Sequence, residues 1–412
     1  MSKRKRQDFE NHQFINSGEV FTNNNIVEEK STKVVKLQQQ EIFSDDVCFE
    51  IISMIDDSWF ILNDCSLISK QFFNVIKERS KLVIEFKKTF TEKRIELFMK
   101  SQFMSSIVNV KFSCRFLEAK FITEMKQLTS LDISENQIGD EGAKYISEMR
   151  QLTSLDISDI EIGDEGAKYI SEMKQLTSLN ISYNAISDEG AKFISEMKQL
   201  MSLHIYKNLI GDEGAKYIRE MKQLTSLNIS YNSISDEGAK FISEMKQLTS
   251  LDIVFNEISG EGAKFISEMK QLTSLDISDN EIGDEGVKYL SEMKQLTSLT
   301  ISGNEITYCN QISEEGAKFI SEMKQLTSLD ISYNLISDEG AKYISEMKQL
   351  TSLNISYNSI SGEGAKFISE MKQLTSLDIV SNRIGDEGAK YISEMKQLTS
   401  LNISDNQFNS NW

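Results

Sequence analysis

The chain has 412 residues, four cysteines, no proline and a formal net charge of −18. A surface this acidic repels phosphate backbones, which argues against nucleic acid as a partner. The start lacks an apolar signal core and no run reaches the roughly 18 apolar residues of a membrane span. We therefore expect no membrane association and a reducing, cytoplasmic setting in which the cysteines stay unpaired.

Residues 1–40 are polar and show no periodicity, so we expect a disordered tail. Its basic run, Lys3-Arg4-Lys5-Arg6, fits two readings, a nuclear import signal or a solvated basic tail. A nuclear location therefore stays open beside the cytoplasmic one.

Residues 41–80 change character abruptly. Ser44-Asp45-Asp46 predicts a helix start, and Val47 and Ile51 follow at helical spacing. A second helical pattern runs from Leu62 to Ile76. Helices this short cannot bury their apolar faces alone, so they need either the end of the following domain or a partner.

From residue 81 to 127 the periodicity switches between strand and helix. Alternating apolar residues predict one strand at Leu82–Phe86 and another through Val108, Val110 and Phe112. A helical stretch follows each strand. We interpret this segment as two degenerate repeats that cap the core of the domain that follows.

Residues 128–412 contain twelve near-copies of one 24-residue sequence, the last of them truncated. The copies begin at Leu128, Leu152, Leu176, Leu200, Leu224, Leu248, Leu272, Leu296, Leu326, Leu350, Leu374 and Leu398. They hold 45 acidic and 25 basic residues, a net −20, because the first 127 residues carry 18 acidic and 20 basic ones of the 63 and 45 in the chain.

In the first copy Leu128, Leu131 and Ile133 are expected to point inward from a short parallel strand. Asn136 follows at the turn, where its amide can satisfy backbone groups of adjacent turns. Asp140 and Glu141 then stand where a helix N-terminus favours negative charge. A strand, a turn and a helix in 24 residues predict an α/β fold, a right-handed leucine-rich-repeat solenoid with a concave parallel sheet and convex helices.

Comparison of the copies shows two variable columns, one on the strand (Asp132 and its equivalents) and one three residues later (Glu135 and its equivalents). Aromatic rows suit protein recognition because they offer large contact area at modest ordering cost. The alternative is that the copies are young duplicates with little specialisation. The candidate partner-binding residues are Tyr183, His204, Tyr206, Tyr231, Phe255, Tyr333 and Tyr357.

Two further departures break the pattern. Ile160 replaces the turn asparagine in the second copy, a local defect that neighbouring turns must absorb. Residues 307–312 are a six-residue insertion that lengthens the eighth copy to 30 residues, and it is either a contact site or a tolerated loop.

Catalysis finds little support in the sequence. Only two histidines occur, His12 and His204, and no phosphate-cradling glycine loop or nucleophile elbow is present. The Asp-Glu pairs recur in almost every copy, which fits helix caps rather than a catalytic pair. We expect no enzyme activity, no cofactor and no metal site.

Residues 42–77 resemble an F-box. Phe43-Ser44 stands at the family's Leu-Pro start, Asp46-Val47 and Ile51-Ile52 follow, and residues 67–73 (LISKQFF) match its closing signature. The repeats resemble the ribonuclease-inhibitor-like class, most closely a 24-residue subclass with a Gly-Ala-Leu-Ala motif, at whose place residues 142–145 stand. This pairing is the arrangement of substrate receptors of cullin-based (SCF-type) ubiquitin ligases, including versions that bacteria deliver into host cells.

The resemblance implies a non-catalytic receptor, a monomeric solenoid within a complex, that holds a protein substrate on its concave face near the ubiquitin-loaded enzyme. The residues that would dock the Skp-type adaptor are Phe43, Val47, Ile51, Leu67, Ile68 and Phe72. The competing interpretation is an interaction scaffold or inhibitor with no role in ubiquitination, whose helices at 41–80 only cap the solenoid. The identity of the substrate and the organism lie beyond the sequence.

Overall fold

The computed structural model describes residues 82–86, 107–112, 123, 125–303 and 310–407. The predicted tail, the F-box-like helices and the six candidate adaptor-binding residues lie outside these ranges. Among the described residues, no helix is long and apolar enough to cross a membrane.

Fourteen parallel strands form one sheet in strict chain order. The first two are β1 (Leu82–Phe86) and β2 (Ile107–Phe112), which precede the regular copies. The other twelve are Ser130–Asp132 (β3), Ser154–Asp156 (β4), Ser178–Asn180 (β5), Ser202–His204 (β6), Ser226–Asn228 (β7), Ser250–Asp252 (β8), Ser274–Asp276 (β9), Ser298–Thr300 (β10), Ser328–Asp330 (β11), Ser352–Asn354 (β12), Ser376–Asp378 (β13) and Ser400–Asn402 (β14).

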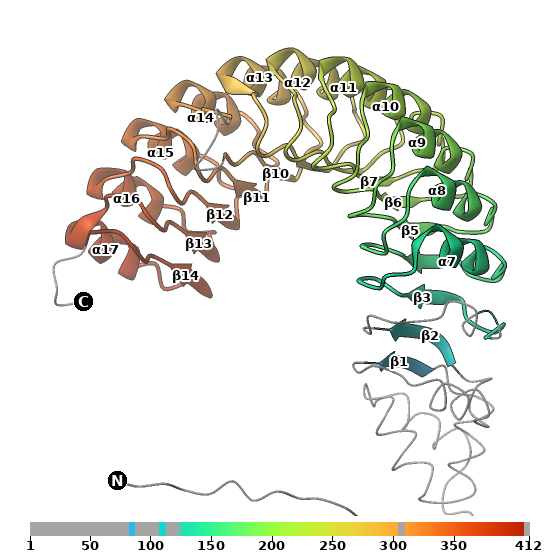
Figure 1. The fold of residues 1–412 in the computed structure, drawn as a ribbon. Coiled ribbons are helices and arrows are strands. Elements are labelled where there is room, and N and C mark those ends of the chain that lie inside the picture. The colour runs from blue at the N-terminus through green and yellow to red at the C-terminus, as the bar shows by residue number, and fades with distance from the viewer. Residues whose placement is uncertain (1–81, 87–106, 113–122, 124, 304–309, 408–412) are drawn as a thin grey trace, which may run out of the picture. The chain divides into compact units, whose positions relative to one another are not determined.

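One short helix follows each strand from β3 to β13. The helices are Gly139–Ile146 (α7), Asp164–Ile170 (α8), Asp188–Ile194 (α9), Asp212–Ile218 (α10), Asp236–Ser243 (α11), Gly260–Ile266 (α12), Gly283–Leu290 (α13), Glu314–Ser321 (α14), Asp338–Ser345 (α15), Gly362–Ser369 (α16) and Gly385–Ser393 (α17). Figure 1 shows the strands along the inner side of a curved array and the helices along its outer side. This arrangement confirms the predicted solenoid.

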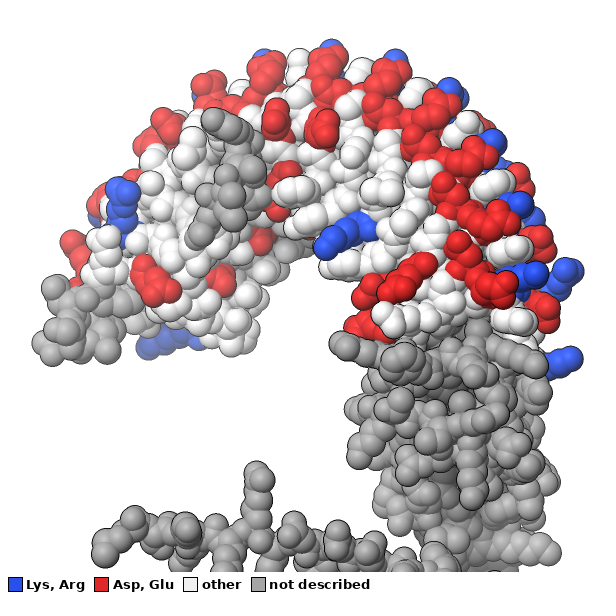
Figure 2. Space-filling view, in the orientation of Figure 1, with Lys and Arg blue, Asp and Glu red and all other residues white. Residues whose placement is uncertain are grey.

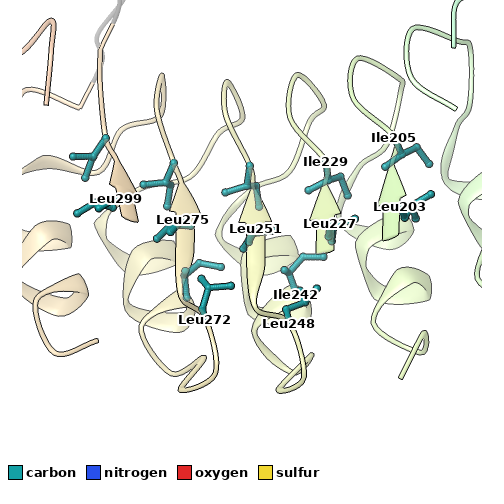
Figure 3. Close-up of a cluster of buried hydrophobic side chains, with 14 of the residues drawn as sticks. Leu203, Ile205, Leu227, Ile229, Ile242, Leu248, Leu251, Leu272, Leu275 and Leu299 are labelled. Atoms are coloured by element: carbon teal, nitrogen blue, oxygen red, sulfur yellow. The ribbon is translucent and has the colours of Figure 1, made fainter. Parts of the chain in front are cut away.

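The core is a stack of identical layers between sheet and helices. In the first copy Leu128, Leu131, Ile133, Ala143 and Ile146 are each at most 1% exposed. Each layer lies on the next because the strands from β3 to β14 all pair in the same register, as Leu131 does with Leu155. Figure 3 shows the leucine and isoleucine side chains of successive strands in line, with Ile242 of α11 facing them.

The early strand β2 joins the sheet with a different inward set from the one predicted. Val110 pairs with Leu131, and Ile107 and Val110 are both fully buried, whereas Val108 is only partly buried. The simple alternation expected through Val108 was therefore wrong. The three-residue spacing of Ile107 and Val110 reproduces that of Leu128 and Leu131, so β2 follows the repeat's own pattern.

The turn asparagine forms a ladder that holds adjacent copies together, as predicted. Asn208 is representative: its Nδ2 donates to the carbonyl oxygens of Ile181 in the preceding copy (3.1 Å) and Ile205 in its own (3.2 Å). Its Oδ1 accepts from Ile186 N (3.0 Å). At position 160 the second copy has the fully buried Ile160 instead, and Asn184 of the next copy makes the usual bonds of a turn asparagine, donating to Ile157 O (3.0 Å) and accepting from Ile162 N (3.1 Å).

The acidic residue at each helix start caps the following copy rather than its own helix. Asp188 of α9 accepts from the backbone N–H groups of Gly211 (2.7 Å) and Gly214 (3.0 Å) at the start of α10. Where the next copy has serine, as at Ser235, its hydroxyl also donates to the aspartate, Asp212 (2.6 Å). The predicted caps are therefore inter-repeat contacts.

Two copies carry glycine instead of this aspartate, Gly260 and Gly362. In each case the following helix starts differently, with a glycine in the left-handed region, Gly283 (φ +61°) and Gly385 (φ +59°). At Gly163, which follows the capping Asp140, φ is −114°. The presence of aspartate or glycine at this position of one copy thus determines the backbone conformation at the start of the helix in the next copy.

A matched pair of substitutions tests this dependence. We expect Gly283→Ser to lower the free energy of unfolding by about 1 to 2 kcal/mol, because a side chain is disfavoured in the left-handed region. Gly163→Ser should be within about 0.5 kcal/mol of wild type, since its backbone is extended and equivalent copies carry serine there. Urea denaturation of both variants measures the difference, and equal losses would refute the link.

The eighth copy is longer than the others, and the structure places its extra residues earlier than expected. Asn310 takes the ladder position, donating to Ile277 O (3.4 Å) and accepting from Ile282 N (3.2 Å), and Ile312 is fully buried at the next consensus position. The predicted position of the insertion, residues 307–312, was therefore wrong, because the copy contains two Asn-x-Ile matches and the second of them takes the consensus place. The six extra residues are 304–309, which lie outside the described ranges.

Candidate functional site

The second variable column lies in the turn after the strand, and its residues have an unusual backbone. Tyr183, Tyr231 and Phe255 have φ of 53°, 53° and 50°. The left-handed region costs a residue with a side chain roughly 1 to 2 kcal/mol and is normally filled by glycine or asparagine. The same position is left-handed in most copies, for example at Glu135 and Ser381, so this backbone belongs to the turn of the repeat and carries the aromatic side chains where a copy has them.

Four aromatic rings line up across four successive copies, and we call Tyr183, Tyr206, Tyr231 and Phe255 the aromatic ladder. The ring centroids of Tyr183 and Tyr206 are 4.9 Å apart, those of Tyr206 and Tyr231 are 5.0 Å apart, and those of Tyr231 and Phe255 are 4.7 Å apart. The last two rings stack at 10°. Such contacts hold the rings in place before any partner arrives.

The ladder is partly open to solvent. Tyr183 is 45% exposed and Phe255 43% exposed, while Tyr206 and Tyr231 between them are half-buried. The Tyr183 and Tyr206 hydroxyls share a hydrogen bond of 3.3 Å, and burial followed by this bond raises the pKa of Tyr206. Burial and the nearby Asp279 also raise the pKa of Tyr231. Both of these hydroxyls are therefore protonated at physiological pH.

The seven predicted residues do not form one group. Tyr333 and Tyr357 stack on each other, with centroids 3.9 Å apart, and form a separate pair that starts three copies beyond Phe255. His204 is exposed on β6 within the ladder's copies, and its charge acts on Asp252. The structure thus brings together four of the seven as the ladder, with His204 on the strand beside them.

Sequence reasoning missed three exposed residues in the copy that begins at Leu200, one of which contacts the aromatic ladder. Met201 is 52% exposed and Leu209 is 65% exposed. The Nζ of Lys207 lies 4.7 Å from the centre of the Tyr183 ring. The sequence could have drawn attention to this copy, because it alone has methionine, Met201, where the other eleven copies have threonine.

The strand column carries carboxylates that face each other across the sheet. Asp252 of β8 pairs in register with Asp276 of β9. Asp276 accepts from Ser278 N (3.1 Å) and Ser278 Oγ (2.7 Å), and Asp252 accepts from Asn228 Nδ2 (3.3 Å). Within the described ranges neither forms an ion pair, whereas Asp132 at the start of the column meets Lys111 at 2.7 Å.

Burial, and then the charges of Asp252 and Asp330, raise the pKa of Asp276, although its bonds from Ser278 oppose this. A carboxyl with a raised folded pKa holds its proton more tightly in the folded state, so its ionisation costs stability at neutral pH. We expect Asp276→Asn to raise the free energy of unfolding at pH 7 by roughly 0.2 to 1 kcal/mol, the range of cross-strand pairs.

Asparagine fits this place, because Asn180 accepts the same bonds from Ser182 in another copy. The gain should disappear as pH falls below the unfolded aspartate pKa of about 3.9, where Asp276 is protonated in both states. Urea denaturation of both proteins at pH 7 and at low pH measures it. A variant that is less stable at pH 7, or whose gain does not depend on pH, would contradict the expectation.

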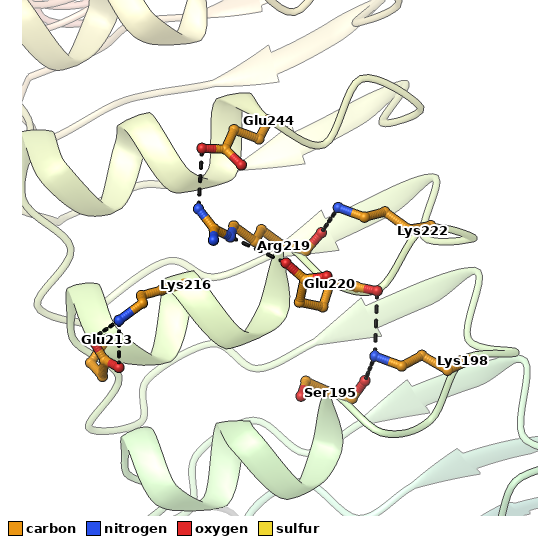
Figure 4. A network of polar contacts seen from close by, with 8 residues as sticks. All are labelled: Ser195, Lys198, Glu213, Lys216, Arg219, Glu220, Lys222 and Glu244. Atoms are coloured by element: carbon orange, nitrogen blue, oxygen red, sulfur yellow. Dashed lines mark hydrogen bonds and ion pairs between the residues drawn. The ribbon is translucent and has the colours of Figure 1, made fainter.

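The outer face carries most of the charge but looks like a solvated surface. Acidic side chains crowd over the helices in Figure 2. Their ion pairs are exposed, such as Lys216 to Glu213 at 2.9 Å and Arg219 to Glu244 at 3.1 Å, shown in Figure 4. Exposed pairs of this kind contribute little to stability. The inner face is thus the better candidate for a specific site.

Comparison with known proteins agrees with this architecture. A family model described as a leucine-rich repeat region matches residues 215–412, and two further leucine-rich repeat models match residues 174–234 and residues 126–147 with 149–171. A search among curated proteins finds no match.

One of the solved structures that match shares this fold. The chain is similar to an internalin, InlF, from Listeria monocytogenes, with 22% identity and a TM-score of 0.59 over 85% of this chain and 94% of that one. A leucine-rich repeat protein of Leptospira interrogans matches with 17% identity and a TM-score of 0.47 over 86% of this chain and 94% of that one. Family models that match along residues 126–412, on a structure built of the same repeat, show that the chain is a leucine-rich repeat protein.

Proposed function

We propose that this chain is a non-catalytic recognition protein whose aromatic ladder binds a segment of a partner protein. The observation that carries the proposal is the ladder itself, four rings in contact of which three stand in the left-handed turn position. Rigid, half-buried tyrosines are the side chains most enriched where binding energy concentrates in protein interfaces.

A protein partner fits better than single-stranded nucleic acid, which also stacks on aromatic rows. Nucleic acid needs a basic groove beside the rings to hold its phosphates. Here the strands beside the ladder carry Asp252 and Asp276, and the copies as a whole carry a net −20, 25 basic against 45 acidic residues. This charge repels a phosphate backbone.

We further propose that the partner is the substrate of a cullin-based ubiquitin ligase, for which this chain is the receptor. The support is the F-box-like pattern of residues 42–77, with Phe43, Leu67 and Phe72 among the residues that would dock a Skp-type adaptor. In this proposal the repeats belong to the ribonuclease-inhibitor-like class, and the protein acts in the cytoplasm or the nucleus. The alternative is a scaffold or inhibitor that uses the same ladder without an adaptor.

Peptide display tests the ladder without knowledge of the partner. A random peptide library is selected on wild type, on Tyr231→Ser/Phe255→Ser and on the matched outer-face variant Tyr145→Ser/Tyr169→Ser. We expect wild type and the outer-face variant to recover the same peptide families and the ladder variant to recover none of them. Families that survive the loss of both ladder rings would contradict recognition by the ladder.

Co-purification tests the ligase role separately. Wild type should retain a Skp-type adaptor, Leu67→Asp should lose it, and the ladder variant should keep it, because adaptor and substrate surfaces are independent. If wild type retains no adaptor, the receptor role fails and the scaffold alternative stands.

A further inference from the structure

We propose that the segment bound by the ladder presents an arginine, whose guanidinium stacks on the Tyr231 and Phe255 rings and pairs with the carboxylates of Asp252 and Asp276. The inference rests on the proposed function and names the chemistry of the partner. It joins two features that lie in three successive copies, an open aromatic platform and a carboxylate pair that has no lysine or arginine partner among the described residues.

The rings and carboxylates come from neighbouring copies. Tyr231 lies three residues after Asn228 of β7, and Phe255 lies three residues after Asp252 of β8, each in the turn that follows its strand. Adjacent strands lie about 4.8 Å apart. Asp276 is near enough to Tyr231 for its charge to act on the tyrosine hydroxyl.

Among the described residues no lysine or arginine pairs with these carboxylates, and only the exposed His204 acts on Asp252 as a cation. Asp252 and Asp276 face each other in register, and their hydrogen bonds come from the neutral groups of Asn228 and Ser278. Across strands, like charges repel, and a cation placed between them converts this repulsion into attraction. At the other end of the same column Lys111 fills that role for Asp132.

The rings add a second attraction for a cation. The faces of aromatic rings attract Lys and Arg, and this chain already uses such contacts, with Lys207 over Tyr183 at 4.7 Å and Arg219 over Phe241 at 5.0 Å. Phe255, at the end of the ladder, is 43% exposed. Its neighbouring column position in the next copy is another carboxylate, Asp279, which strengthens the negative field there.

Arginine suits this site better than lysine. Its planar guanidinium stacks flat on a ring while its edge donates to carboxylate oxygens, whereas the ammonium of lysine is a compact and strongly hydrated charge. An acidic segment is repelled by Asp252 and Asp276, and an apolar segment leaves their charges buried without a partner.

Three fluorescent Gly-Ser peptides of equal length serve as probes, with three arginines, three lysines or three citrullines, the last of which keep the shape without the charge. Anisotropy titrations use the full chain near physiological salt. We expect the arginine peptide to bind more tightly than the lysine peptide, and the citrulline peptide to bind at least about tenfold more weakly than the arginine peptide.

Charge-matched variants separate a site from general attraction to an acidic protein. Asp252→Asn/Asp276→Asn should weaken arginine-peptide binding about tenfold, and Tyr231→Leu/Phe255→Leu should do the same. Glu244→Gln/Glu268→Gln removes the same charge from the outer face and should change affinity less than twofold. Thermal denaturation confirms folding, and the double asparagine variant is expected to be at least as stable as wild type.

Equal weakening by the outer-face pair, or equal affinity for the citrulline peptide, would overturn the inference. If the arginine peptide does not bind while displayed peptide families still require the aromatic ladder, only the proposal that the partner presents an arginine is wrong. If both fail, the proposed function is wrong as well.

Discussion

Replacing Asn280 by alanine is expected to lower the free energy of unfolding by about 3 to 4 kcal/mol, the largest effect we predict for one side chain outside the apolar core. Asn280 is 2% exposed, and its Nδ2 donates to the carbonyls of Ile253 (3.0 Å), Ile277 (3.2 Å) and Ser278 (3.0 Å). Its Oδ1 accepts from the backbone N–H groups of Asn256 and Ile258, both at 3.2 Å.

Alanine removes every one of these bonds and leaves backbone groups of two copies in a site closed to water. Each buried group left without a partner costs about 1 to 3 kcal/mol, and partial relaxation keeps the total below their sum. Urea denaturation with hydrogen exchange at the neighbouring amides measures the loss globally and locally, since a repeat array need not unfold in one step.

The exposed Ser233→Ala, in the position after another ladder asparagine, is the control and should have almost no effect. A loss below about 1 kcal/mol at Asn280 would mean that neighbouring asparagines can replace it. The stabilisation that the turn asparagines provide would then be shared among neighbouring copies rather than confined to one.

Asp338→Ala is expected to cost about 2 to 3 kcal/mol. Asp338 accepts from Ser361 N (2.7 Å), Ser361 Oγ (2.6 Å) and Gly364 N (3.0 Å), and so binds the start of α16 to the preceding copy. The negative charge of Asp338 also interacts favourably with the positive N-terminal end of α16. Hydrogen bonds to a charged group contribute more to stability than hydrogen bonds between neutral groups. A Cβ at residue 364 would lie 2.5 Å from Asp338 Oδ1, which explains the glycine.

The neighbouring Glu339→Ala is the matched control, because Glu339 is exposed and only pairs with Lys342 (3.1 Å). It should cost less than about 0.5 kcal/mol. Equal effects of the two substitutions in urea denaturation would show that position 338 acts only as surface charge. Asp338→Asn, which keeps an acceptor oxygen, should lie between wild type and alanine.

Much of the fold could be predicted because each copy repeats the sequence pattern of the same strand, turn and helix. The inward residues, such as Leu131 and Ala143, follow from periodicity, and Asn136 follows from the need to satisfy buried backbone groups. The partner of Asp140 could not be predicted in this way, because Gly163 and Gly166 lie in the next copy and contact it only once the copies stack. A sequence read one copy at a time assigns the cap to the wrong helix.

The insertion and the site show two further limits. The eighth copy contains two Asn-x-Ile matches, and only the packing of Ile312 and the bonds of Asn310 distinguish them. The second variable column contains three rings of the aromatic ladder, and Tyr206 lies one position before that column. The left-handed backbone at Tyr231 and the separation of Tyr333 and Tyr357 from the ladder depend on geometry that residue identity does not encode.

The most direct test of the account is the affinity of a displayed peptide for two matched tyrosine variants. We predict that Tyr231→Ser/Phe255→Ser on the inner face weakens binding at least about tenfold, a loss of about 1.4 kcal/mol or more. Tyr145→Ser/Tyr169→Ser on the outer helices should leave the affinity unchanged. Undiminished binding by the inner-face variant, or an equal loss from both, would contradict recognition by the aromatic ladder.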